Sequence, residues 1–78
     1  MKPRLRPIKH LYHRFGVHTG LDAIDVARAL ELKGLIDMIP TDGETLLYRE
    51  TDLMRELPAD TYTDTILACL EAYKRGNL

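Results

Sequence analysis

Hydrophobic residues recur at helical spacing near the start of the chain. They fall at i, i+3, i+4 and i+7, on one helical face: Ile8, Leu11, Tyr12 and Phe15. Pro7 suits the first turn of this helix, because its missing N–H would have no partner there. Gly16 is placed to end the helix in the left-handed conformation, so we predict a loop over residues 17–20.

A second helical pattern follows this loop. Ile24, Ala27 and Leu30 share one stripe, and they predict a helix that runs to about Lys33 and ends at Gly34. Either Thr19 or Asp22 can cap its first turn. A competing register ends the helix at residue 30 and turns at residue 31, but Pro40 leaves little room for the helix that this register requires next.

Two short apolar runs, residues 35–39 and 45–49, predict a β-hairpin. The segment that joins them contains Asp42-Gly43, which is a strong local turn signal between such runs. A two-stranded hairpin alone is marginally stable, so this one must lie against the helices.

Two helices are predicted after the hairpin. Thr51 caps a short one over residues 52–57, which Pro58 ends. Asp60 or Thr61 starts the last helix, and Gly76 ends it. The inner face of that helix carries Tyr62, Ile66, Cys69, Leu70 and Tyr73. The fold class expected is mostly α with one β-hairpin, in the order α-turn-α-β-hairpin-α-α, with residues 1–6 as a flexible or extended basic arm and residues 7–78 as a single domain.

Charge is distributed unevenly along the 78 residues. Residues 1–20 carry five basic residues and no acid, whereas residues 21–78 sum to −6, which gives the net charge of −1. A basic end on an acidic body suggests an anionic partner, either nucleic acid or an acidic protein face. The alternative is that the basic end lies over the chain's own acids.

Compartment and membrane association follow from composition. No apolar run approaches the roughly 20 residues that cross a membrane, and no apolar stretch follows the basic N-terminus, so neither a membrane span nor a secretory signal is expected. The single cysteine excludes a disulfide within the chain. A cytoplasmic protein is the default expectation.

Residues for catalysis or metal binding are scarce. The chain has no serine and no phosphate-binding glycine motif, and Cys69 is expected to be a buried hydrophobe. His10 and His13 could share a metal ion with His18 as a third ligand, but zinc sites need three or four ligands, so solvent-facing histidines are expected instead. We therefore predict a protein that is not an enzyme and has no metal or cofactor.

Several residues repeat the pattern of a known family. Three groups carry it: Ile8, Leu11, Gly16 and Val17; Gly34-Leu35-Ile36; and Tyr48, Asp52 and Leu53. Together with the order of the elements, these residues resemble the MerR-type winged helix, a layout that phage excisionases share, over residues 8–57. The chain departs from the family in a longer second helix, which lacks the Arg-rich DNA-reading face, and in an acidic hairpin tip.

The resemblance implies a stoichiometric DNA-binding regulator, with the arm and first helix on phosphate and the second helix toward a groove. The basic residues available for this role are Lys2, Arg4, Arg6, Lys9, Arg14, Arg28, Lys33 and Arg49.

The alternative is a phage- or plasmid-type inhibitor or adaptor, similar to some anti-CRISPR proteins. Its acidic face would block the nucleic-acid-binding surface of a partner protein. The acids available are Asp22, Asp25, Glu31, Asp42 and Glu44. The last helix could also pair with a second copy of the chain or only close the core.

Overall fold

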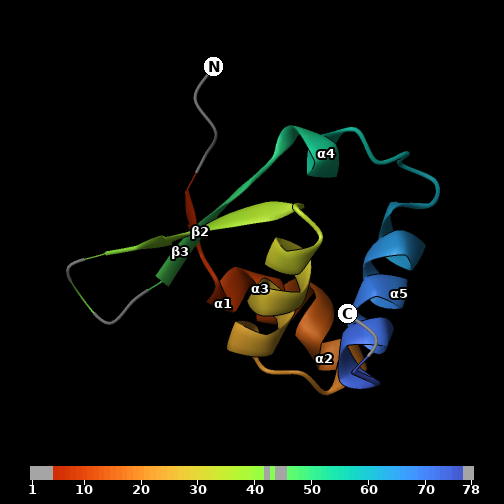
Figure 1. Ribbon diagram of the computed structural model, residues 1–78, viewed down its shortest axis with the longest axis horizontal. Helices are drawn as coiled ribbons and strands as arrows, with labels where there is room; N and C mark the ends of the chain where they lie inside the picture. The colour runs from red at the N-terminus through yellow and green to blue at the C-terminus, as the bar shows by residue number, and fades with distance from the viewer. Residues whose placement is uncertain (1–4, 42, 44–45, 77–78) are drawn as a thin grey trace.

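The computed structural model describes residues 5–41, 43 and 46–76. Within them the chain forms a mixed α/β fold (Figure 1), with the elements β1 Arg6–Pro7, α1 Lys9–Leu11, η1 Tyr12–Gly16, α2 Val17–Thr19, α3 Ala23–Leu32, β2 Ile36–Pro40, β3 Leu46–Glu50, α4 Asp52–Arg55 and α5 Tyr62–Lys74. Because α1, the π-helical η1 and α2 follow one another without a break, we treat them together as the N-terminal helix.

The sheet of the described residues has three antiparallel strands in the order β1-β3-β2, rather than the two strands of the predicted hairpin. Arg6 pairs with Tyr48 and Pro7 with Leu47. Pro7 therefore lies in an edge strand, where a missing N–H is tolerated, and does not begin the helix. Arg6, predicted as part of the arm, is extended but held against β3. Leu5 of that arm is exposed, and residues 1–4 lie outside the described residues.

Gly16 does not end the N-terminal helix. Its φ is −64°, and the helix continues to Gly20, whose φ of 77° is left-handed. A Cβ on Gly16 would lie 2.5 Å from the backbone oxygen of Leu21 and 2.7 Å from a ring carbon of Tyr12. Glycine is needed here because the chain that leaves the helix passes close to it, and the loop predicted at residues 17–20 is helical up to Thr19.

The predicted limits of α3 are confirmed. Of the two candidate caps, Asp22 fills the position, since its Oδ1 accepts a hydrogen bond from the backbone N–H of Asp25 at 2.9 Å. Thr19 is instead buried, and its hydroxyl donates to backbone oxygens within its own helix. The helix runs through Leu32, and Gly34 follows in the left-handed conformation with φ of 72°, so the competing shorter register is wrong.

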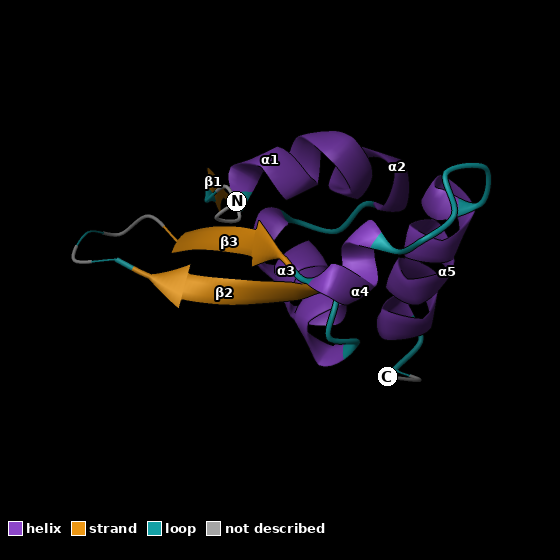
Figure 2. Ribbon diagram, turned by 90° about the horizontal axis from the view of Figure 1, so that it is seen from above, coloured by secondary structure: helices purple, strands orange, loops and turns teal. Residues whose placement is uncertain are grey.

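The predicted hairpin is confirmed, with each strand displaced by one residue. Its register runs from Ile36 opposite Glu50 to Pro40 opposite Leu46. β2 and β3 extend from the helices to one side in both views (Figures 1 and 2). The acidic residues predicted at the tip, Asp42 and Glu44, lie outside the described residues.

The cap at Thr51 joins two parts of the fold. The oxygen of its hydroxyl accepts a hydrogen bond from the backbone N–H of Met54 at 3.4 Å. The O–H donates a hydrogen bond to the carbonyl oxygen of Gly34 at 2.7 Å. The start of α4 is thereby fixed to the turn after α3. Residues 56 and 57, expected to be helical, form a turn and a bend before Pro58.

The last helix presents the predicted face to the core. Ile66, Cys69 and Leu70 are buried, and Tyr62 and Tyr73 pack against the core from the same helix. The core lies where the N-terminal helix, α3, the sheet and α5 meet. Its buried hydrophobic members are Leu11, Phe15, Val26, Ala27, Ala29, Leu30, Leu35, Ile36, Tyr48, Met54, Ile66, Cys69 and Leu70.

Candidate nucleic-acid interface

A basic surface lies on β1 and the N-terminal helix, in a segment of the sequence that contains no acid. We define the N-terminal basic surface as Arg6, Lys9 and His13. Lys9 and His13 are four residues apart in the helix, so they share one exposed face, and Arg6 adjoins that face through its contact with His10. Neither Arg6 nor Lys9 forms an ion pair with any acid in the part of the chain that the structure describes. Their charges are therefore available to an external anion.

Arg14 has a different role from the predicted phosphate contact. Its Nη2 donates to Tyr62 Oη at 2.7 Å, and its Nη1 lies 3.8 Å from Glu50 Oε2. The guanidinium also lies over the ring of Phe15, 4.7 Å from the centroid. Arg14 thus holds the N-terminal helix against β3 and α5, and it compensates the charge of Glu50.

His10 is half-buried and bonded to the core, not solvent-facing as predicted. Its Nδ1 lies 2.7 Å from Tyr48 Oη, and Arg6 Nη1 lies 3.5 Å from its Nε2. A guanidinium can only donate, so the two contacts are compatible when Nε2 accepts and Nδ1–H donates to the tyrosine. Burial lowers the pKa of His10 below its usual 6.5, and the positive charges of Arg6 and Arg14 lower it further. The imidazole is therefore neutral at pH 7.

Acidification is expected to destabilise the protein through His10. Because its pKa is lower in the folded than in the unfolded chain, the unfolded chain binds the proton more readily. The stabilisation is complete above about pH 6.5 and is lost as the pH falls toward the folded-state pKa. Urea unfolding at pH 7.5 and 5.5 should show a smaller loss of stability on acidification in His10→Gln than in the wild type. His13→Gln, an exposed imidazole on the same helix, is the control, and equal losses in all three proteins would contradict this role.

The other predicted basic residues that the structure describes lie on β3, or on α3 and its C-cap. Arg49 Nε donates to Asp37 Oδ2 across the hairpin at 3.3 Å. Arg28 is exposed on α3, and Lys33 is the C-cap of that helix. The remaining two candidates, Lys2 and Arg4, lie outside the described residues.

The N-terminus of α3, which the resemblance directs toward a DNA groove, carries two carboxylates. Asp22 is exposed as its cap, and Asp25 is half-buried and accepts a hydrogen bond from Tyr73 Oη at 3.4 Å. Neither carboxylate is paired with a basic side chain among the described residues. Insertion of this end would bring the charge of Asp22 toward phosphate.

The members of the predicted acidic face that the structure describes all belong to α3 or its N-cap. Asp22 and Glu31 stand at opposite ends of α3, about 14 Å apart along its axis at 1.5 Å per residue. Asp25 turns toward α5, and the hairpin-tip acids fall outside the described part of the chain.

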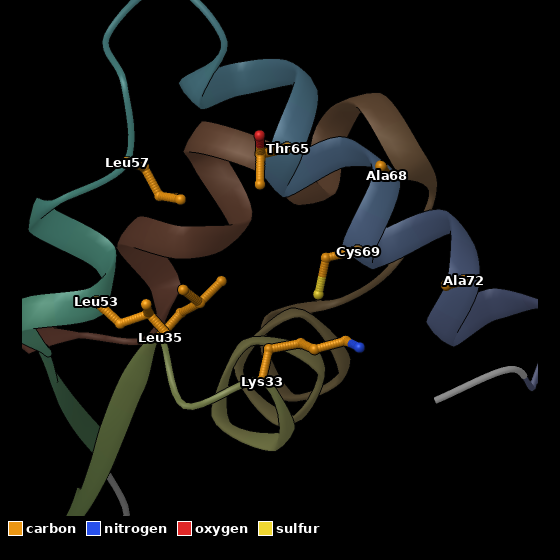
Figure 3. Close-up of a pocket in the computed structure, with 8 residues that line it drawn as sticks. All are labelled: Lys33, Leu35, Leu53, Leu57, Thr65, Ala68, Cys69 and Ala72. Atoms are coloured by element: carbon orange, nitrogen blue, oxygen red, sulfur yellow. The ribbon is translucent and has the colours of Figure 1, made fainter.

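Two features were missed at the level of sequence. The His10–Tyr48 bond joins residues 38 apart, so no local pattern signals it. An apolar groove between α4 and α5 is lined by eight residues, the first at position 33 and the last at position 72 (Figure 3). Its only sequence signal is the stripe of small residues at 65, 68 and 72 of α5.

The residues that the structure describes contain neither a cluster of metal ligands nor a membrane-spanning helix. No three His, Cys, Asp or Glu side chains within them gather closely enough to hold a metal ion. Nor does any helix in those ranges have the length and apolar character needed to cross a membrane.

Comparisons of the chain with protein-family models, with curated proteins and with solved structures find no match. Function must therefore be inferred from the residues themselves.

Proposed function

We propose that the protein is a small non-enzymatic regulator that binds duplex DNA through phosphate contacts from the N-terminal basic surface, on a winged-helix-like scaffold. The observation that carries the proposal is that Arg6 and Lys9 project from a segment without acids and have no acidic partner among the described residues. Lysine and arginine contacts with phosphate supply most of the affinity of non-specific DNA binding.

The order of elements supports the comparison with MerR-type winged helices and excisionases. A helix, a turn, a second helix, a hairpin and two further helices follow one another as in that layout. The acids at the start of α3 argue for a different use of the scaffold, in which the N-terminal helix contacts the backbone and α3 does not read bases. Contacts with phosphate position a protein but carry no sequence information, so we expect weak discrimination between DNA sequences.

Removing charge from the basic surface is expected to weaken DNA binding and its salt dependence. The variant Arg6→Gln with Lys9→Gln loses two phosphate contacts, and the slope of log K against log salt should become shallower by about 2. Fluorescence anisotropy with a labelled random duplex, titrated at several salt concentrations, measures both quantities.

A charge-matched control separates this surface from general electrostatics. Arg28→Gln with Arg75→Gln also removes two positive charges, from exposed residues of α3 and of the turn after α5. This control should retain the wild-type slope more closely than the first variant. An equal or larger loss in the control would overturn the assignment of the N-terminal basic surface.

For the protein-binding alternative, the described acids stand at the two ends of α3, and the other acids of its set lie outside the described residues. A wild-type protein that fails to bind duplex DNA even at low salt would favour a protein partner.

A further inference from the structure

An apolar groove lies between α4 and α5, on residues that the DNA proposal does not use. The volume of this open groove is about 410 Å³. Figure 3 shows Leu53 and Leu57 on one side, the small residues of α5 on the other, and Leu35 between them. The volume lies within the range of sites that hold small molecules, roughly 300–1,000 Å³.

Small side chains on α5 keep the groove open. Thr65, Ala68 and Ala72 are spaced at i, i+3 and i+7, so they form one stripe along the helix. Opposite these residues, Leu53 is 50% exposed. Apolar surface left exposed in this way is unfavourable, and an apolar ligand that covered it would be stabilised.

One end of the groove is positively charged. Lys33 contributes the only charged side chain of the lining, and within the described residues it forms neither an ion pair nor a side-chain hydrogen bond. Figure 3 shows the side chain of Lys33 lying below the sulfur of Cys69. Burial raises the pKa of the Cys69 thiol, whereas the charge of Lys33 acts to lower it. No acid lines the groove to compensate this charge.

We propose that the groove binds a small amphipathic carboxylate, of the class of medium-chain fatty acids. The aliphatic chain lies along Leu35, Leu53, Leu57 and the alanines, and the carboxylate accepts hydrogen bonds from the ammonium of Lys33. An apolar lining with one unpaired cation matches a ligand with an apolar body and one anionic end.

A chain-length series tests the apolar part of the site. Hexanoate, octanoate and decanoate, each below its micelle concentration, are titrated into the full chain and followed by calorimetry. Affinity should rise about fourfold per buried methylene, from roughly 0.8 kcal/mol for each. A flat series, or no binding at millimolar concentrations, would overturn the proposal.

The charged end is tested with Lys33→Met, which replaces the aliphatic part of the side chain by one of the same length and removes the ammonium. The variant should bind decanoate up to about fivefold more weakly, as expected for an exposed ion pair, and bind the neutral decanol with unchanged affinity. If the wild type binds decanoate no better than decanol, the assigned role of Lys33 is wrong and the anionic specificity falls with it.

A second substitution distinguishes a ligand site from a protein interface. Ala68 is exposed, so Ala68→Phe fills the groove without entering the core and should abolish decanoate binding. Thr63→Phe, at an exposed position of the same helix outside the lining, is the size-matched control and should bind as the wild type does. Sedimentation that shows a dimer broken by Ala68→Phe but unaffected by decanoate would instead assign the groove to a second copy of the chain and overturn the proposal.

Discussion

Replacing Leu30 by alanine is expected to lower the free energy of unfolding by about 2–5 kcal/mol. Leu30 is fully buried on α3 and belongs to the core that α3 shares with the sheet and α5. The truncation leaves a cavity that the packed neighbours fill only in part. A domain of this size has roughly 5–15 kcal/mol of total stability, and short chains lie at the lower end, so the variant is expected to be partly unfolded at 37 °C.

Leu32→Ala is the matched control, because it makes the same substitution two residues later in the same helix. Leu32 is 65% exposed, and alanine favours helices at least as well as leucine, so its effect should stay within about 0.5 kcal/mol. Urea unfolding monitored by circular dichroism measures both variants. Similar losses at the two positions would show that α3 does not bury the face assigned to it.

Gly16→Ala is expected to destabilise the protein by about 1–3 kcal/mol, the usual cost of overpacking. Helix propensity alone predicts the opposite sign, since alanine is favoured over glycine by about 1 kcal/mol within a helix. The steric argument prevails because the added Cβ would lie 2.5 Å from the backbone oxygen of Leu21, which cannot rotate away as a side chain can.

Val17→Ala provides the comparison for Gly16→Ala. Val17 is the next residue of the same helix and is 57% exposed, so this substitution should be neutral or slightly stabilising. Thermal and urea unfolding of both variants test the prediction. A stabilised Gly16→Ala would mean that the chain at Leu21 does not approach the helix closely.

Elements set by local chemistry could be predicted from the sequence. Asp22 and Thr51 cap their helices, and Gly34 and Gly76 end theirs, because each acts on backbone groups within a few residues. The hairpin can be predicted from the sequence for the same reason, since its turn and its two apolar runs are adjacent in the chain.

Features that depend on distant partners could not be predicted. Arg6 of β1 pairs with Tyr48 of β3, and two residues that lie 42 apart in the sequence give no local signal of strand pairing. The sequence predicts a helix stop at Gly16, because glycine favours the left-handed conformation, whereas its actual role depends on the approach of Leu21.

The candidate site likewise has features that the sequence predicts and features that depend on tertiary contacts. The absence of acids from residues 1–20 is a property of the sequence, and it predicts that Arg6 and Lys9 contact an anionic partner. Which basic residues are already engaged depends on tertiary contacts: Arg14 with Glu50, and Arg49 with Asp37 across the hairpin. A sequence alone lists charges, but their availability to a ligand is decided by the fold.

The most direct test of DNA binding by the N-terminal basic surface is an NMR titration of the ¹⁵N-labelled chain with a random DNA duplex at low salt. We predict amide shift changes concentrated in β1 and the first turns of the N-terminal helix, around Arg6, Lys9 and His13, which diminish as salt is added. Changes centred instead on the N-terminus of α3, around Asp22, or no changes at any DNA concentration, would contradict the account.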